Sequence, residues 1–186
     1  MTNSAYTYRL IAENDLTPDD HQRISDLLVK AFPRHAHVFK TVSYDYTQPE
    51  YRLWMEDEQG TIIAHLDLAH RLIDVDGIDV PTIGIGEVAT HPDYQGQGLG
   101  RMLMDKLKVI LREQFTADYG ILLCGESVAG YYERVGWHRL DQPVYEQDLH
   151  TREIHISHEP AMILPIHKTI DEWHTEGIID IRGLPW

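Results

Sequence analysis

The period of apolar positions along the chain changes several times, and each change predicts an element. From residue 99 to 115 the apolar side chains recur three and four positions apart, which is the spacing of one helical face. An earlier helix is predicted to begin after Asp15 or Thr17, with Pro18 in its first turn. Its apolar face comprises Ile24, Leu27, Leu28, Ala31 and Phe32. A third, short helix is predicted over residues 127–135.

Alternating or short apolar runs predict the strands of a sheet. These strands span residues 6–12, 51–56, 61–72, 82–90, 120–124, 136–140, 144–149 and 161–166. Strands interspersed with helices indicate the α/β (α+β) class, with one mixed sheet. A chain of 186 residues is long enough to bury a core of its own, so a single domain over residues 1–186 is expected.

The stretch between the strand at 82–90 and the helix from 99 is rich in glycine. It reads Gln95, Gly96, Gln97, Gly98, Leu99 and Gly100, with Arg101 next. A strand, a glycine-rich turn and a helix aim backbone N–H groups and the helix dipole at one point, where a phosphate or pyrophosphate binds. A P-loop would need lysine after the last glycine, and a Rossmann fingerprint would need different glycine spacing near the start of a βαβ unit. Neither is present.

The loop fits the pattern Q/R-x-x-G-x-G/A through Gln95, Gly98 and Gly100, and so resembles the pyrophosphate loop of the GCN5-related N-acetyltransferases (GNAT superfamily). Residues 131–137 resemble the same superfamily's fourth helix and sixth strand. The resemblance implies a GNAT fold, in which a mixed, mostly antiparallel sheet is flanked by helices and its splayed fourth and fifth strands hold acetyl-CoA. The residues expected to bind this cosubstrate are Val88, Ala89, Thr90, Gln95, Gly96, Gln97, Gly98, Leu99, Gly100 and Arg101. The acceptor site of the superfamily corresponds to residues 35–49 here.

The outer regions resemble two narrower families. Residues 161–166, 170–173 and 179–183 look like the C-terminal part of the nodulation protein A acyltransferases, and the tail ending in Trp186 also resembles the aminoglycoside 2′-N-acetyltransferases. Both families acylate the amine of a glucosamine-like ring, one with a fatty acyl group from a carrier protein and the other with acetyl from CoA. An amino sugar or aminoglycoside-like amine is therefore the expected acceptor, and the glycine-rich loop favours CoA as donor. Paired chains in these families make a homodimer the expected assembly.

Acetyl transfer to an amine needs a base for the ammonium, polarisation of the thioester carbonyl and a proton for the departing thiolate. The resemblance makes Tyr132 the candidate general acid; the alternative is that its ring only packs. Trp186 matches a terminal tryptophan whose α-carboxylate reaches the active site in the aminoglycoside enzymes. The acidic residues that accompany it there are absent here, because Leu184-Pro185 and Arg34-His35 occupy those positions.

Glu87 is the candidate base. Strand alternation places it on one face with Ile83, Ile85 and Ala89, where an apolar setting would raise its pKa toward neutrality. The alternative is a paired structural glutamate. The aminoglycoside enzymes carry their strand glutamate one position earlier, at Gly86, and a shift of one residue reverses the face. Their base therefore does not transfer directly to Glu87.

Charge and composition narrow the function further. The net charge of −14 disfavours nucleic-acid binding and favours a cationic small-molecule acceptor, although an acidic surface also serves solubility. The twelve histidines lack metal-ligand spacing, so no metal is expected. A single cysteine, Cys124, suits a reducing compartment and reads as a buried strand residue. No apolar run reaches membrane-spanning length, and the first six residues lack a signal sequence, so a cytoplasmic protein without membrane association is expected.

Three hypotheses follow. The leading one is an N-acetyltransferase that moves acetyl from acetyl-CoA to a primary amine by direct attack in a ternary complex. The second is a longer-chain N-acyltransferase like nodulation protein A; it needs a basic patch for an acidic carrier, which the net charge disfavours. The third is a non-catalytic acetyl-CoA sensor, which would keep the loop and lose the acid and base.

Overall fold

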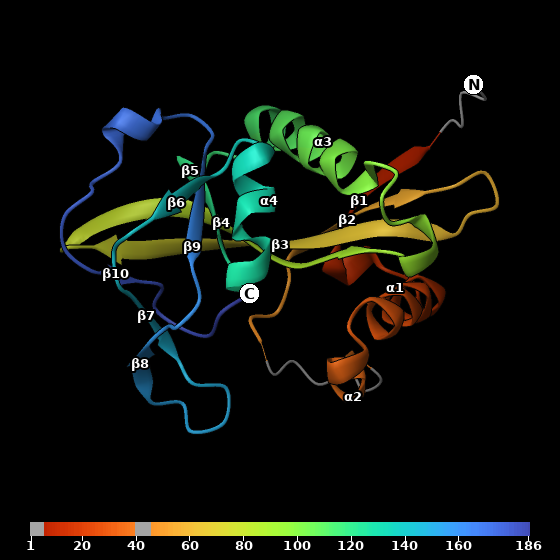
Figure 1. The fold of residues 1–186 in the computed structure, drawn as a ribbon, viewed down its shortest axis with the longest axis horizontal. Helices are drawn as coiled ribbons and strands as arrows, with labels where there is room; N and C mark the ends of the chain where they lie inside the picture. The colour runs from red at the N-terminus through yellow and green to blue at the C-terminus, as the bar shows by residue number, and fades with distance from the viewer. Residues whose placement is uncertain (1–5, 40–45) are drawn as a thin grey trace. The chain divides into compact units, whose positions relative to one another are not determined.

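The computed structural model describes residues 6–39 and 46–186 (Figure 1). It divides into two compact units. The first comprises Met1–Tyr44, Pro49–Leu68 and Glu87–Leu107, and the second comprises Asp45–Gln48, Ala69–Gly86 and Lys108–Trp186. Residues 1–5 and 40–45 lie outside the described residues. The first stretch carries most of the prediction that the N-terminus lacks a signal sequence, and the second carries part of the predicted acceptor site. The single domain over residues 1–186 stays a prediction.

The first unit contains an antiparallel strand ladder. β1 (Thr7–Ala12) pairs with β2 (Tyr51–Glu56), and β2 pairs with the first part of β3 (Ile62–Val75). In the β2–β3 register Arg52 lies opposite Asp67 and Trp54 lies opposite His65. Because directly opposed residues point to the same face of a sheet, these four side chains share one face. This face carries the charged cluster described below.

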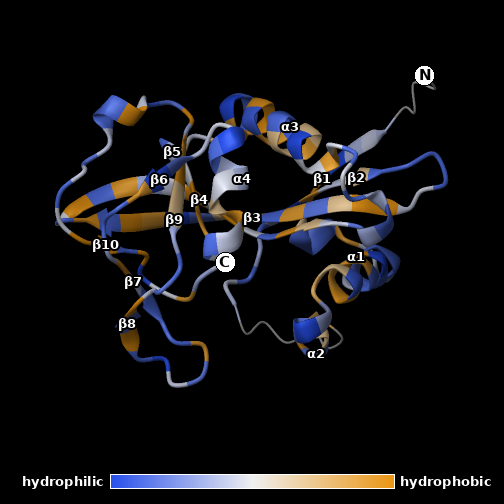
Figure 2. Cartoon of the chain, in the orientation of Figure 1, coloured by the Kyte–Doolittle hydropathy of each residue, from blue (hydrophilic) through white to orange (hydrophobic). Residues whose placement is uncertain are grey.

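Helix α1 (Pro18–Ala31) covers that ladder. Thr17 is its N-cap: its hydroxyl accepts from the Asp20 N–H, and the Asp20 carboxylate accepts from the Thr17 N–H, each at 3.1 Å. The helix turns alternate between apolar and polar residues in Figure 2. The apolar stripe packs with residues of the sheet in one buried cluster, which consists of Ile24, Leu27, Leu28, Trp54, Ile62 and Ala89. Short helical turns flank α1, namely η1 (Glu13–Asp15), η2 (Pro33–His35) and α2 (Ala36–Phe39).

The other ladder is mixed, and its strands β3 and β4 contribute residues to both units. The strand order is β6–β9–β5–β4–β3–β10–β7–β8. The bounds are β4 (Ile78–Thr90), β5 (Tyr119–Leu123), β6 (His138–Leu140), β7 (Val144–Gln147), β8 (Ile154–Ile156), β9 (Ala161–Pro165) and β10 (Ile179–Asp180). Its parallel pairs are β4 with β5 and β10 with β7, and the remaining pairs with a described register are antiparallel. Together with the helices α3 (Leu99–Gln114) and α4 (Glu126–Arg134), this mixed sheet confirms the expected fold class.

The β4–β5 pair is short. Thr82–Gly84 pair with Tyr119–Ile121, while β5 continues to Leu123 and β4 continues beyond Gly84 without further register pairs in the described part of these strands. The two strands therefore separate after Gly84 and Ile121, as the GNAT fold implies.

Both units have apolar interiors. The second is built around buried side chains of β3, β5 and β9, with Trp173 and Ile179 added from the C-terminal segment. A T-shaped contact joins the rings of Tyr119 and Trp173, whose centroids lie 5.1 Å apart. Of the helices in residues 6–39 and 46–186, none combines the length and apolar character needed to cross a bilayer.

Candidate active site

The glycine-rich loop leads from β4 into α3, as its sequence predicts. β4 ends at Thr90, η3 (Pro92–Tyr94) turns the chain, and α3 begins at Leu99. Gly96 and Gly98 have φ angles of 76° and 82°, in the left-handed region that side chains with a Cβ adopt at a cost. A Cβ at either residue would meet nothing within 4 Å, so backbone conformation rather than crowding explains these glycines.

Hydrogen bonds of two side chains hold the start of the glycine-rich loop in place. The Tyr94 hydroxyl donates to Asp57 Oδ2 at 2.7 Å, and the Gln95 amide donates to the Thr90 carbonyl at 3.3 Å. Burial works to raise the pKa of Asp57, but hydrogen bonds from Tyr94 and from backbone amides outweigh it and lower the pKa. The loop is therefore braced against the β2–β3 turn.

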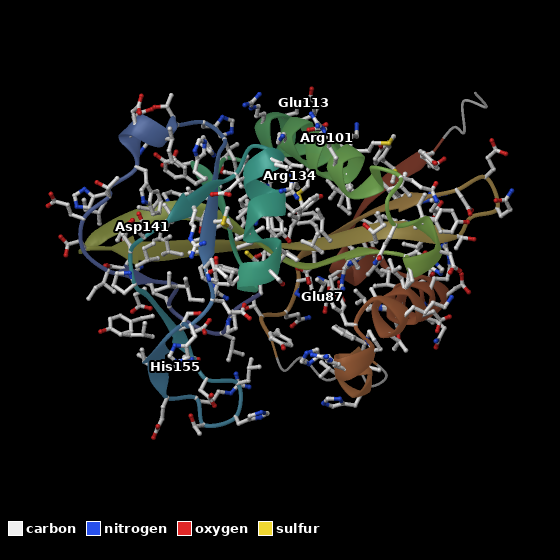
Figure 3. All side chains as sticks on the ribbon, in the orientation of Figure 1. Glu87, Arg101, Glu113, Arg134, Asp141 and His155 are labelled. Atoms are coloured by element: carbon white, nitrogen blue, oxygen red, sulfur yellow. The ribbon has the colours of Figure 1, made fainter. Side chains whose placement is uncertain are left out.

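The start of α3 has the features of an anion site. The first backbone bond into the helix runs from the Met102 N–H to the Gly98 carbonyl at 3.1 Å, and the N–H groups of a helix's first turn have no partner within the helix. Arg101 lies on this turn of α3 (Figure 3), exposed and 3.8 Å from Asp105. Lys30 of α1 lies 3.3 Å from His91 Nε2, which adds a second cation next to the loop. These groups suit a diphosphate.

Glu87, which Figure 3 labels, interrupts β4. Its φ of 47° lies in the left-handed region that is uncommon for a non-glycine residue. Such a residue breaks strand alternation. The expectation that Glu87 shares a face with Ile83 and Ile85 rests on unbroken alternation, which this geometry removes. Ala89 lies two positions after Glu87, beyond the left-handed residue, and packs in the buried cluster under α1.

The Glu87 carboxylate lies in a buried charged cluster within the first unit. Arg52 Nη1 donates to Glu87, and Arg52 Nε donates to Glu13 Oε2 at 2.8 Å. Asp67 also hydrogen-bonds to Glu87. Glu13, Arg52 and Asp67 are at least nine-tenths buried, while one fifth of the Glu87 side chain is exposed. Glu87 is thus the member of the cluster with solvent access.

Burial raises the proton affinity of Glu87 against the opposing effect of Arg52 and Asp67. Burial raises the pKa of Glu87, the charge of Arg52 opposes this rise, and the charge of Glu13 adds to it. Burial disfavours the charge on Arg52, but Glu87, Asp67 and Glu13 outweigh it and raise the pKa of the guanidinium. Arg52 therefore stays charged. A carboxylate with a raised pKa suits a general base near neutral pH.

His65 completes the surroundings of Glu87. Its Nδ1 lies 3.2 Å from the Glu87 carbonyl, and because a carbonyl only accepts, Nδ1 must carry the proton. Burial, together with the nearby charge of Arg52, lowers the pKa of His65 to about 3. The His65 ring is therefore neutral at neutral pH, and its hydrogen bond to the Glu87 carbonyl holds the backbone at this left-handed residue.

Tyr132 lies on α4 in the second unit, and 7% of its surface is exposed. Its ring makes T-shaped contacts with Tyr131 and Trp137, at centroid distances of 5.2 Å and 6.0 Å. Burial raises the pKa of Tyr132, so its hydroxyl stays protonated at neutral pH and is suited to donating a proton. Burial likewise raises the pKa of Cys124 to about 11, which fits the expected inert thiol.

Trp186 is held within the second unit by Gly84 and Arg71. A Cβ on Gly84 would lie 1.7 Å from Trp186 Cε2, so the indole covers the glycine directly. On the ring lies the Arg71 guanidinium, 4.6 Å from the ring centroid. Arg71 Nη1 also donates to the carbonyls of Ile181 and Leu184, at 3.1 Å and 2.6 Å. Burial lowers the pKa of Arg71 to about 10, which leaves it charged at neutral pH.

The tail is anchored a second time by Arg182, whose Nη2 lies 3.0 Å from Asp74 and 2.6 Å from Asp79. These ion pairs give Arg182 a role in anchoring the tail. The α-carboxylate role of Trp186 stays a prediction.

The predicted site residues fall in both units. Glu87 and residues 88–101 belong to the first unit, while Tyr132 and Trp186 belong to the second. Sequence reasoning missed Arg52, Asp67 and Arg71. The available signal was a charged residue inside an otherwise apolar strand, as in Arg52-Leu53-Trp54-Met55, where a buried charge requires a partner.

Comparison with solved structures supports the fold. A GNAT family N-acetyltransferase (YhbS) from Escherichia coli, solved in complex with CoA, matches with a TM-score of 0.63 and 21% identity. The match covers 98% of this chain and 93% of that one. An acyl-CoA N-acyltransferase from Pseudomonas aeruginosa matches with a TM-score of 0.56 and 18% identity, over 86% of this chain and 99% of the other. The fold of this chain is thus similar to the folds of these two enzymes.

Sequence comparison gives the family. The family model described as Nodulation protein A (NodA) matches residues 3–184. Nodulation protein A of Mesorhizobium sp. (strain 7653R) is 27% identical, and that of Rhizobium tropici is 25% identical, each over 97% of both chains. The chain belongs to the nodulation protein A family and is an acyltransferase. The resemblance of the outer regions to the nodulation protein A acyltransferases is confirmed, and their resemblance to the aminoglycoside 2′-N-acetyltransferases stays a prediction.

Proposed function

We propose that this acyltransferase uses acetyl-CoA and acylates the primary amine of a small cationic acceptor, an amino sugar or aminoglycoside-like molecule. The observation that carries the proposal is the loop before α3, where two left-handed glycines precede a helix start with free N–H groups. A diphosphate needs this close backbone approach, and the open space at Gly96 and Gly98 provides it. Arg101 lies on the first turn of α3, and Lys30 lies beside His91, which directly follows β4.

The chemistry is direct attack in a ternary complex. The amine nitrogen forms a bond to the thioester carbonyl carbon, and the carbon–sulfur bond breaks. Glu87, directly or through a water, accepts the proton that the ammonium must lose before attack. The Tyr132 hydroxyl gives a proton to the thiolate that leaves. The raised pKa values of both groups support these roles.

The acceptor assignment has electrostatic support. A net charge of −14 concentrates cations near the surface, and Glu87 offers a partly exposed carboxylate. Family membership adds a second candidate donor, a longer acyl chain, because the match to the nodulation protein A family covers residues 3–184. The acidic surface disfavours docking of an acidic carrier protein, so CoA remains the donor we propose even for a longer chain.

The test is a thiol-release assay with matched donors and acceptors. Acetyl-CoA and long-chain acyl-CoA are each combined with glucosamine, a chitin oligosaccharide carrying one free amine, an aminoglycoside and a neutral sugar without an amine. We expect thiol release only with amine acceptors, and an acylated amine by mass spectrometry. Thiol release that does not depend on the amine, or transfer only from an acyl carrier protein, would refute the proposal.

A separate variant addresses the second candidate base. If the α-carboxylate of Trp186 takes part, removing Trp186 should lower turnover far more than it lowers the melting temperature. Normal turnover in the shortened chain would leave Glu87 as the sole candidate.

A further inference from the structure

The strand β8 lies at one end of the mixed sheet, and among the described strands it pairs with β7 alone. The Ser157 N–H donates to the Val144 carbonyl of β7 at 2.8 Å. Because the backbone groups of successive strand residues point to opposite sides, Ile154 and Ile156 turn their N–H and C=O groups away from β7. In the described part of the chain no hydrogen bond reaches these outward groups. The outer side of β8 is thus an open sheet edge.

The side chains at this edge are apolar and exposed. Ile154 and Ile156 are 64% and 47% exposed, and because they are two positions apart they lie on the same face of the strand. An edge of this kind is a template for pairing with another strand, which proteins commonly prevent with a lysine, a proline or a bulge. β8 reads Ile-His-Ile and carries neither lysine nor proline. The edge is therefore open to a further strand.

The sequence of the edge is complementary to a second copy of itself. Ile-His-Ile reads the same in both directions, and His155, labelled in Figure 3, is its centre. In an antiparallel pair of two β8 strands with a twofold axis at His155, Ile154 lies opposite Ile156 of the second copy. Both residues have outward backbone groups, so each opposed pair exchanges its N–H···O=C bonds. The isoleucines of both copies then meet on one face.

The charges that flank β8 favour this register. With the axis at His155, Glu153 lies opposite Ser157 of the second copy, which is uncharged. With the axis at Ile156, Glu153 would lie opposite Glu159 of the second copy. Like charges directly opposite each other destabilise a sheet, so the second register is disfavoured.

The backbone disfavours the remaining registers. An axis at Ile154 would require Arg152 to pair with Ile156 of the second copy, but the φ of 61° at Arg152 takes this residue out of the strand. An axis between two residues would oppose an outward residue to one that already bonds to β7. The axis at His155 is therefore the register in which all the outward groups of β8 find partners.

We propose that two copies of this chain associate through antiparallel pairing of their β8 strands, with the twofold axis at His155. The contact lies on the second unit and does not depend on the proposed function. It is isologous, because the same edge serves both copies. Since β8 is three residues long, the contact belongs to the small and weak class of interfaces, and the dimer forms in a concentration-dependent way.

Disulfide cross-linking tests the register. Directly opposed residues that share no hydrogen bond have Cα atoms about 4.5 Å apart, which a disulfide can span. Because residue 155 lies opposite itself, His155→Cys should give a disulfide-linked dimer under exchange with oxidised glutathione. Ile78→Cys is the matched control, since Ile78 is 49% exposed in the same unit but lies on β4. The natural Cys124 is 6% exposed, so the natural chain should not cross-link.

The cross-linking result decides the position of the contact. Preferential linkage of the His155→Cys chains supports the proposal. Linkage of the Ile78→Cys chains at an equal rate, or no linkage at residue 155, would overturn it.

Sedimentation equilibrium of the natural chain tests the assembly without any variant. Between about 10 μM and about 1 mM the full chain should pass from monomer to dimer. The double variant Ile154→Lys with Ile156→Lys should weaken the dimer at least about tenfold, because lysine protects a sheet edge. Ile78→Lys, the matched control, should leave the dimer unchanged.

Two sedimentation results would overturn the proposal. One is a natural chain that remains monomeric at the highest concentration. The other is a double variant that dimerises as tightly as the natural chain, which would place the interface away from β8.

Discussion

The indole of Trp186 covers the α-carbon of Gly84, so that a Cβ at residue 84 would lie within 1.7 Å of the ring. Only glycine fits under the ring at this point of β4. Gly84 is also the last β4 residue paired with β5, so the tail residue is seated where the two strands begin to separate. Gly84 and Trp186 are far apart in the sequence, and the fold of the second unit brings them into contact.

Gly84→Ala should displace the tail. The methyl group takes the space of the indole, and such overpacking costs about 1–3 kcal/mol of stability. Tryptophan fluorescence should shift toward solvent exposure, and carboxypeptidase should release the terminal residues faster. Gly125→Ala is the control, because a Cβ there meets nothing within 4 Å and the φ of −61° suits alanine.

The double variant Gly84→Ala with Trp186→Ala separates this contact from a general effect on β4. Removal of the indole should cancel most of the cost of the methyl group in a double-mutant cycle. Additive losses of stability in the two single variants would contradict the contact.

Tyr132→Phe tests the general acid. The substitution keeps the ring packing against Trp137 and removes only the hydroxyl, so turnover should fall at least about tenfold while acetyl-CoA affinity changes little. Steady-state kinetics and calorimetry on the same samples measure the two quantities. Turnover equal to that of the natural chain would assign Tyr132 a packing role alone.

Gly98→Ala tests the loop. Alanine at a φ of 82° costs roughly 1–2 kcal/mol, and relief of this strain reorients the N–H groups that precede α3. Acetyl-CoA affinity measured by calorimetry should fall at least about tenfold, with the melting temperature lowered by only a few degrees. Equal affinity for the two proteins would show that the left-handed backbone at residue 98 is not needed for binding.

Glu56→Gln should destabilise the first unit in a pH-dependent way. Burial works to raise the pKa of Glu56, but bonds from Trp54, Arg9 and Arg23 outweigh it and lower the pKa below the usual 4.5. A lowered folded-state pKa gives stability that is present above pH 4.5 and is lost as pH falls through the folded value. The variant should lose about 1–3 kcal/mol at pH 7, and the difference should shrink below pH 4.5. Urea unfolding at several pH values measures this; a difference that does not vary with pH would contradict it.

Local sequence signals were enough to predict the longer helices and most of the strands. The apolar spacing from residue 99 predicted α3 nearly to its observed end at Gln114, and Thr17 with Asp20 supplied a capping box for α1. The strands at 61–72 and 82–90 extend further, to Val75 and back to Ile78, because Arg182 from the tail pairs with Asp74 and Asp79 on this hairpin. Tertiary contacts of this kind leave no local pattern.

The same reason explains what was missed in the site. The strands β8 and β10 are only three and two residues long and exist through pairing with β7 and β3, so the sequence did not predict them. Arg52, Asp67 and Glu87 are far apart in sequence, and only the β2–β3 register and the left-handed residue of β4 bring their charges together. Glu87 was found as a candidate from its strand, while its partners required the sheet.

The central claim is that backbone amides of the loop before α3 bind the diphosphate of acyl-CoA. Amide NMR of the full chain titrated with acetyl-CoA tests it most directly, with 3′-dephospho-CoA as a control for contacts to the ribose phosphate. We predict the largest shifts at the N–H groups of residues 96–101, with either ligand. Shifts confined to other parts of the chain, or none at millimolar ligand, would contradict the account.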